Sequence, residues 1–166
     1  MCIRDFVLSD LSSLRQMIHD AIDASYSSVY PERAVEFFKA FHSEERIRER
    51  SRKGEILIIE RNNVIVATGA IVDNEVLGVF VRPQEQGSGY GKAIMNELES
   101  RAKTKGFTQM TLAVSLPSRK FYEALGYEIV SDCSVDVGEG QYLDYWEARR
   151  SIASNKLLQP ISQKAS

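Results

Sequence analysis

The stretch "EQGSGYGKA", residues 85–93, places glycines at every second position, at Gly87, Gly89 and Gly91. It follows an apolar run rich in β-branched residues, and a helical pattern begins directly after it. Glycines let backbone N–H groups converge without side-chain obstruction, and a helix N-terminus adds partial positive charge. This arrangement favours the binding of a phosphate or pyrophosphate, although a glycine cluster after a strand also serves as an ordinary tight turn.

Two common nucleotide-binding motifs do not fit this loop. A P-loop requires G-x-x-x-x-G-K-[S/T], but Gln86 stands in place of the first glycine and Ala93 in place of the hydroxyl residue. A Rossmann fingerprint requires G-x-G-x-x-G at the start of a β–α–β unit. This chain has G-x-G-x-G instead, and a series of strand-like runs precedes it. A phosphate-binding loop here therefore needs another fold around it.

The hydrophobic pattern predicts strands and helices that position this loop. Strands are expected at residues 2–8, 55–61, 64–72, 75–81, 107–114, 127–137 and 140–150. Helices are expected at residues 9–22, 32–50, 89–105 and 117–125. The dipeptides "NN" and "DN" tolerate tight hairpin turns, so the three strands that they connect should form an antiparallel meander. The strand–helix–strand unit that contains the loop should be a right-handed crossover with parallel strands.

A third signature fits the loop and its surroundings. The pattern Gln86-x-x-Gly89-x-Gly91 resembles the Q/R-x-x-G-x-G/A signature of the GCN5-related N-acetyltransferase (GNAT) superfamily. The segment "SRKFYEALGYEIV", residues 118–130, resembles the F-Y-x-x-x-G-F/Y segment of that superfamily, and the element order over residues 2–149 is similar. The resemblance implies an α/β (α+β) protein with the acyl-CoA N-acyltransferase fold. This fold has a mixed, mostly antiparallel six- to seven-stranded sheet with a central splayed parallel strand pair, flanked by about four helices.

The resemblance implies that acetyl-coenzyme A lies between the parallel strands 75–81 and 107–114. A bulge in the first of these strands leaves main-chain groups free for the pantetheine arm. The N–H of Val79 or Phe80 is expected to face the thioester carbonyl, where an amide stabilises the developing oxyanion. The family often has an asparagine at the position of Ser115 that contacts the pantetheine, and Ser115 or Ser118 is expected to make this contact instead. The cofactor-binding residues implied are Val79, Phe80, Val81, Gln86, Gly87, Ser88, Gly89, Tyr90, Gly91, Lys92, Ser115 and Ser118.

Acetyl transfer to an amine requires a proton acceptor and benefits from a proton donor. An alkyl amine has a pKa of about 10.4 and is mostly protonated at neutral pH, whereas a leaving thiolate has a pKa of about 8.5. Tyr122 matches the family's tyrosine near the coenzyme sulfur and is the expected general acid, with a buried core tyrosine as the alternative. Glu75 is the candidate base, with an exposed hairpin charge as the alternative, and Asp73 and Glu85 are secondary candidates. No Ser/His or Cys/His nucleophile is visible, so direct attack in a ternary complex is expected.

The acceptor site is expected between the first two helices and the last hairpin. Aromatic side chains that either line this site or belong to the core are Tyr26, Tyr30, Phe37, Phe41, His42, Tyr142 and Trp146. His19 and His42 have no visible partners and are interpreted as ordinary surface or helix residues. The predicted function is an acetyl-CoA-dependent N-acetyltransferase that acts on a primary amine of a small molecule. Acetylation of protein N-termini or lysines, or a non-catalytic acyl-CoA-binding regulatory module, are the alternatives.

Composition limits the other classes of function. The 166 residues favour one domain, expected over residues 1–150, with a polar and frayed tail at 151–166. A net charge of −2 gives no indication of nucleic-acid binding. Cys2 and Cys133 lack metal-ligand spacing, so free thiols and no metal are expected. With neither a secretory signal nor a membrane-spanning stretch visible, a cytoplasmic protein without membrane contact is expected, and the family resemblance leaves a homodimer open.

Overall fold

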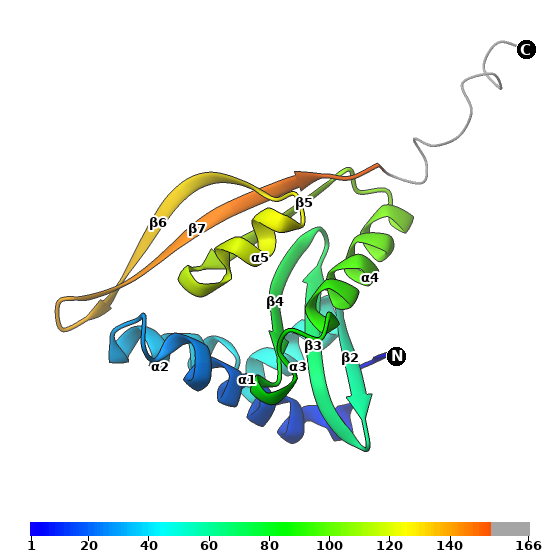
Figure 1. Cartoon of the computed structure of the whole chain (residues 1–166), viewed down its shortest axis with the longest axis horizontal. Coiled ribbons are helices and arrows are strands. Elements are labelled where there is room, and N and C mark those ends of the chain that lie inside the picture. Colours follow the sequence, from blue (N-terminus) through cyan, green and yellow to red (C-terminus); the bar gives the residue numbers. More distant parts are fainter. Residues whose placement is uncertain (154–166) are drawn as a thin grey trace, which may run out of the picture.

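The computed structural model describes residues 1–153, and these form a seven-stranded sheet with helices on both faces (Figure 1). The strand order is β1–β2–β3–β4–β5–β7–β6. Neighbouring strands are antiparallel, except that β4 and β5 are parallel. The predicted fold is therefore confirmed, including the meander of β2, β3 and β4 and the crossover that follows it.

The bounds of the elements agree with most of the sequence prediction. The strands are β1 (Ile3–Asp5), β2 (Glu55–Arg61), β3 (Val64–Val72), β4 (Glu75–Val81), β5 (Gln109–Ser115), β6 (Glu128–Gly138) and β7 (Gln141–Ser151). The α-helices are α1 (Leu11–Tyr26), α2 (Glu32–Phe41), α3 (Glu44–Lys53), α4 (Tyr90–Thr104) and α5 (Arg119–Ala124). Asn62, Asn63 and Asp73 have positive φ angles in the hairpin turns, which explains why these residue types occupy them.

The helix predicted over residues 32–50 is wrong as a single element, because the chain forms two helices there. α2 ends at Phe41, and His42 leaves the helical conformation. Ser43 then begins α3 by accepting a hydrogen bond from the N–H of Arg46 at 3.2 Å. Residues 1–153 therefore form five α-helices where about four are predicted.

The two ends of the predicted domain also differ from the structure. β1 stops at Asp5 because the chain turns into a 3₁₀ segment, Leu8–Asp10, before α1. At the other end β7 continues to Ser151, and Ile152 is buried and donates its N–H to the carbonyl of Thr108 at 2.8 Å. These two residues therefore belong to the folded domain. The prediction of a frayed tail over 154–166 lies outside the described residues.

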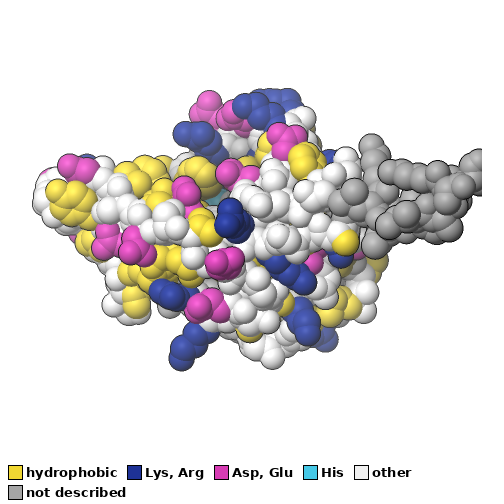
Figure 2. Space-filling model, turned by 90° about the horizontal axis from the view of Figure 1, so that it is seen from above, with side chains coloured by type: hydrophobic (Ala, Val, Ile, Leu, Met, Phe, Trp, Pro, Cys, Tyr) yellow, Lys and Arg dark blue, Asp and Glu magenta, His cyan; other side chains and the backbone are white. Residues whose placement is uncertain are grey.

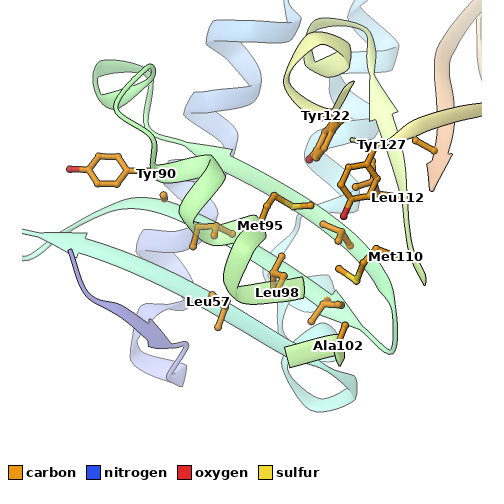
Figure 3. Packing of buried hydrophobic residues seen from close by; sticks show 14 of the residues in the cluster. Leu57, Tyr90, Met95, Leu98, Ala102, Met110, Leu112, Tyr122 and Tyr127 are labelled. Carbon is orange, nitrogen blue, oxygen red and sulfur yellow. The ribbon is translucent and has the colours of Figure 1, made fainter. Parts of the chain in front are cut away.

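Two hydrophobic cores cover the two faces of the sheet. On one face, Met95 and Leu98 of α4 pack onto Leu57 of β2 and Leu112 of β5, as Figure 3 shows. On the other face, helices α1, α2 and α3 bury apolar side chains such as Ile22 against β2, β3 and β4. The sheet is thus held between two helical layers, which is the arrangement that supports a mixed sheet.

A gap opens in the middle of the sheet because the two parallel strands separate. β4 and β5 pair at two positions, Glu75 with Thr111 and Val76 with Leu112. Beyond these positions β4 stays beside β3 and β5 stays beside β7. Figure 1 shows the β6–β7 hairpin diverging from strands β2–β4, with α5 in the angle between them. The central splayed pair is thus present as predicted.

Candidate active site

A β-bulge shapes β4 at the gap. The register with β3 shifts between Val76 and Gly78, so Leu77 is the extra residue. Gly78 has a φ of +144°, a conformation that L side chains rarely adopt. A Cβ at this position would lie 2.9 Å from the Phe80 ring and 3.0 Å from the His42 ring. The bulge therefore requires glycine, and a lone glycine inside a strand pattern is the sequence signal for it.

The backbone of β4 beyond the bulge presents free amides to the gap. The N–H of Arg82 donates to the carbonyl of Val66 in β3 at 2.8 Å. Because the pairing alternates along an antiparallel ladder, the N–H of Phe80 also faces β3. The N–H groups of Val79 and Val81 face the opposite edge, which β5 has left. Of the two amides considered for the thioester carbonyl, Val79 has the required direction.

The glycine loop between β4 and α4 presents an open backbone surface. Gly87 and Gly89 have φ angles of +83° and +86°, and a Cβ at either would meet no atom within 4 Å. Glycine is therefore needed here for the backbone conformation. Gly89 is the residue that precedes α4, and no side chain in the described chain caps this helix. The helix N-terminus thus keeps its donors for an anion.

Gly91 has a different reason to be glycine. A Cβ at this position would lie 3.1 Å from the ring of Phe121, so the small residue lets α4 approach α5 closely. Tyr90 is buried, and its hydroxyl accepts a hydrogen bond from Arg61 at 2.6 Å, pointing away from the core in Figure 3. Tyr90 therefore anchors the start of α4. The side chains of Gln86, Ser88 and Lys92 are exposed on the loop and the first helical turn.

A cavity of about 670 Å³ lies where β4, β5 and β7 meet α1 and α2. Tyr122 of α5 lines this cavity. The Tyr122 hydroxyl has no hydrogen bond to another described residue. In residues 1–153, every side-chain N or O atom that is sealed from solvent has a hydrogen-bond partner, so this hydroxyl is not sealed. The hydroxyl therefore reaches the cavity. Burial raises the pKa of Tyr122, and the neighbouring Tyr26 raises it further, so the phenol holds its proton at neutral pH.

Three more hydroxyls line the same part of the cavity. The Oγ atoms of Ser115 and Ser118 lie 2.7 Å apart at the end of β5. The hydroxyl of Tyr26 interacts with both serines, and these hydrogen bonds oppose the rise in its pKa that burial causes. Both serines proposed to contact the pantetheine thus lie beside Tyr122.

Charged side chains line the open side of the cavity. Glu75 lies at the paired end of β4 and β5, is exposed and lines the cavity. Glu147 and Arg149 of β7 line the same cavity, and sequence reasoning missed them. The alternating polar pattern of β7 is the signal that puts them on one face with Tyr145. The secondary base candidates Asp73 and Glu85 lie outside the residues that line the cavity.

The structure brings part of the predicted aromatic set together. The cavity is lined by Tyr26, Phe37, Phe41 and His42. Tyr30 is instead buried, and its hydroxyl bonds the main chain of β7 at 2.7 Å and of the segment after β5 at 2.8 Å. Trp146 packs in the core on the α4 side, with the Arg119 guanidinium 4.7 Å from its ring centre. Tyr142 lies near the β6–β7 turn and is 52% exposed.

The interpretation of both histidines as residues without partners is wrong. His42 is 4% exposed, and its Nδ1 lies 3.0 Å from Nη1 of Arg50. Its ring packs edge-on against Phe80 with centroids 4.9 Å apart. Nε2 of His19 lies 3.0 Å from the main-chain oxygen of His42. Burial lowers the pKa of His42 well below its usual range, and the positive charge of Arg50 acts in the same direction.

One face of the molecule carries charges of both signs (Figure 2). On the face in Figure 2, basic and acidic side chains are interspersed, and hydrophobic side chains gather toward the end opposite the grey residues. Among residues 1–153, no helix has the length and apolar character needed to cross a membrane. The same part of the chain holds no cluster of three or more His, Cys, Asp or Glu side chains suited to a metal ion.

Comparisons with known proteins identify the family. A family model described as "Acetyltransferase (GNAT) domain" matches residues 25–138. An uncharacterized acetyltransferase of Streptococcus pyogenes is 32% identical over 72 residues, 40% of this chain and 51% of that protein. The chain therefore spans about half the length of the curated relatives it matches. It belongs to the GNAT acetyltransferase family.

Solved structures agree in fold. A GCN5-related N-acetyltransferase of Rhodopseudomonas palustris superimposes with a TM-score of 0.83 at 20% identity, covering 91% of this chain and 95% of that chain. PaiA N-acetyltransferase of Thermoplasma acidophilum, crystallised with coenzyme A, has a TM-score of 0.72 at 20% identity, covering 90% and 98%. The chain thus has the acyl-CoA N-acyltransferase fold.

Proposed function

We propose that this protein is an acetyl-CoA-dependent N-acetyltransferase that acts on the primary amine of a small molecule. The observation that supports this most strongly is the gap between β4 and β5, bordered by the bulge at Gly78. A pantetheine arm carries amide groups that can pair with the free edge of β4 in the manner of an added strand. Family membership and the coenzyme A in the Thermoplasma relative support the same cofactor.

The residues present fit this cofactor at both of its polar parts. In the proposal, Val79 and Val81 bind the pantetheine through their main chain. The backbone of residues 86–91 binds the pyrophosphate, because Gly87 and Gly89 leave the helix N-terminus open. The exposed Lys92 adds positive charge beside this loop. Ser115 and Ser118 take the place of the family's asparagine.

Acetyl-CoA supplies the acetyl group as an activated thioester, and the residues around the gap control charge and protons. We propose that the N–H of Val79 donates to the acyl carbonyl oxygen, where negative charge develops. The Tyr122 hydroxyl gives its proton to the coenzyme sulfur, and burial raises its pKa, so this hydroxyl is protonated at neutral pH. Glu75 accepts the proton of the amine, directly or through water. No covalent enzyme intermediate is required.

The cavity supports a small acceptor. Its volume of about 670 Å³ falls within the range of small-molecule sites. Val79, Ser115 and Tyr122 line the same cavity, so the acetyl end of the cofactor takes part of this volume and the rest is left for the acceptor.

Phe37 and Phe41 supply apolar walls. The guanidinium groups of Arg46 and Arg50 already lie 5.9 and 5.4 Å from the centre of the Phe41 ring. Glu75 and Glu147 supply negative charge on the open side. An amine with an apolar body fits these walls.

The test combines cofactor binding with a search for the acceptor. Saturating acetyl-CoA should raise the melting temperature, because a ligand that binds the native state stabilises it. Release of coenzyme A thiol should then be measured against amino acids, polyamines, aminoglycosides and peptides. Turnover of a small amine supports the proposal, and turnover of peptides alone would identify a protein acetyltransferase. A melting shift without any turnover would identify a regulatory module, and no melting shift would contradict cofactor binding.

A further inference from the structure

A buried pair of basic side chains, His42 and Arg50, has no part in the chemistry proposed above. His42 lies in the wall of the cavity, and Arg50 lies behind it beside a small void that His42 also lines. His42 is 4% exposed and Arg50 is 7% exposed. Nη1 of Arg50 lies 3.0 Å from Nδ1 of His42, and Nη2 donates to the carbonyl of Phe41 at 3.0 Å. The imidazole packs on the bulge, with its Cε1 3.0 Å from the position of a Cβ on Gly78. The pair therefore lies directly behind the cofactor strand.

The contact with Arg50 fixes which nitrogen of His42 carries the proton. A guanidinium has donors and no acceptor, so Nδ1 must accept and the neutral ring holds its proton on Nε2. Nε2 has no hydrogen-bond partner among the described residues. Because every sealed polar side-chain atom of these residues has such a partner, Nε2 is not sealed from solvent. His42 lines both the cavity and the small void beside Arg50. Because Nδ1 faces Arg50 on the side of the void, we infer that Nε2, across the ring, opens on the cavity. The site thus contains a fixed hydrogen-bond donor.

The charge of Arg50 has no carboxylate partner among the described residues. The nearby Glu49 instead pairs with Lys53 at 2.6 Å. Burial lowers the pKa of Arg50 to about 10, which still leaves it protonated at neutral pH. A buried cation without a counter-ion is unfavourable, and an approaching anion relieves this penalty. The cation also polarises the imidazole, so Nε2–H becomes a stronger donor.

We propose that His42 selects the acceptor by donating its Nε2–H to a carboxylate oxygen of the amine substrate, while Arg50 is a positioning residue that holds the tautomer and supplies positive charge. The acceptor is then an amine that also carries a carboxylate, such as an amino acid. This proposal rests on the proposed function and narrows its substrate class. Glu75, Glu147 and Arg149 also line this cavity. The two glutamates disfavour a substrate carboxylate beside them, and solvent screens the charge of the exposed Arg149 more than that of the buried Arg50.

The first test compares matched acceptors. For each L-amino acid and its primary amide, kcat/KM is measured by thiol release in the wild type, in His42→Phe and in His42→Gln. The wild type should prefer the acid, and His42→Phe should reduce this preference on the order of tenfold to a hundredfold, the size of a hydrogen bond to a charged group. His42→Gln keeps an amide donor and should retain part of the preference. Equal use of acids and amides by the wild type, or an equal loss for both in His42→Phe, overturns the proposal.

The second test does not depend on turnover. Wild-type protein with ¹⁵N-labelled histidine is titrated with propionate, propionamide and propylamine, three molecules of equal length, with and without coenzyme A. Before titration, Nδ1 of His42 should be unprotonated and Nε2 protonated. Propionate should then move the Nε2–H resonance of His42 more than the other two do. A protonated Nδ1, or a resonance that propionate leaves unmoved, overturns the proposal. A failed melting shift with acetyl-CoA would instead contradict the proposed function, and this titration could still be interpreted.

Discussion

Replacing Gly78 by alanine should damage the cofactor strand in a way that the structure quantifies. An L residue at a φ of +144° is strained by on the order of 1–3 kcal/mol. The added Cβ would lie 2.9 Å from the Phe80 ring and 3.0 Å from the His42 ring, so both rings must move. Overpacking of this kind destabilises by about 1–3 kcal/mol. We expect Gly78→Ala to lower the free energy of unfolding by about 2–6 kcal/mol.

The same substitution should weaken acetyl-CoA binding, because relaxing the bulge redirects the N–H of Val79. Loss of one main-chain hydrogen bond predicts a decrease in affinity of about three- to tenfold. Urea denaturation measures the stability, and calorimetric titration at a temperature where both proteins are folded measures the affinity.

Gly140→Ala is the matched control for Gly78→Ala. Gly140 has a φ of +72°, and a Cβ there would meet no atom within 4 Å. The control should lose about 1–2 kcal/mol of stability from strain alone and keep its affinity for acetyl-CoA. The reasoning fails if Gly78→Ala has wild-type stability and affinity, or if Gly140→Ala loses as much affinity.

Three further predictions concern single side chains. Tyr122→Phe should lower kcat by about 10²–10⁴ without changing the Kd for acetyl-CoA; an unchanged rate of thiol release would exclude Tyr122 as the acid. Glu99 is buried and accepts bonds from Arg150 at 2.6 Å and Tyr127 at 3.2 Å, so Glu99→Ala should cost about 1–3 kcal/mol in urea denaturation. Glu97, whose half-buried side chain pairs with Arg101 at 3.2 Å, serves as its control. A loss in Glu97→Ala equal to that in Glu99→Ala would contradict a special role of Glu99. The pKa of His42 in the folded state lies below 6.5, so the unfolded chain binds the proton more readily. The free energy of unfolding should therefore fall as the pH drops below about 6.5, by at most about 1.4 kcal/mol per pH unit. Denaturation curves of His42→Gln should show a smaller dependence on pH.

Local signals were sufficient to predict most of the fold. Asn62, Asn63 and Asp73 in the hairpin turns have positive φ angles, and Asn and Asp are residue types that tolerate this conformation. The glycine loop is equally local, because Gly87 and Gly89 are explained by their own backbone conformations. The start of α3 also had a local signal, since Ser43 followed by Glu44 and Glu45 is a typical helix N-terminus. This signal divides the segment 32–50 into two helices, as the structure shows.

The candidate site was harder to predict from the sequence, because tertiary contacts decide which of two similar residues lines the site and which belongs to the core. Tyr26 and Tyr30 lie one helical turn apart, yet Tyr26 lines the cavity and Tyr30 bonds the main chain of β7. The pairing of His42 with Arg50 depends on the angle between α2 and α3. A prediction of one continuous helix over these residues has no such angle and so could not show the pair. The position of Glu147 in the cavity wall depends on the register of β7 against β5, which the sequence alone does not define.

The central claim is that the free edge of β4 and the glycine loop bind coenzyme A. An NMR titration of ¹⁵N-labelled protein with acetyl-CoA tests this claim most directly, because each backbone amide reports separately. The largest changes should fall on the amides of Val79 and Val81 and on those of residues 86–91, while the amides of the β6–β7 turn should stay unchanged. Binding that leaves the β4 and loop amides unmoved, or an absence of binding at saturating acetyl-CoA, would contradict the account.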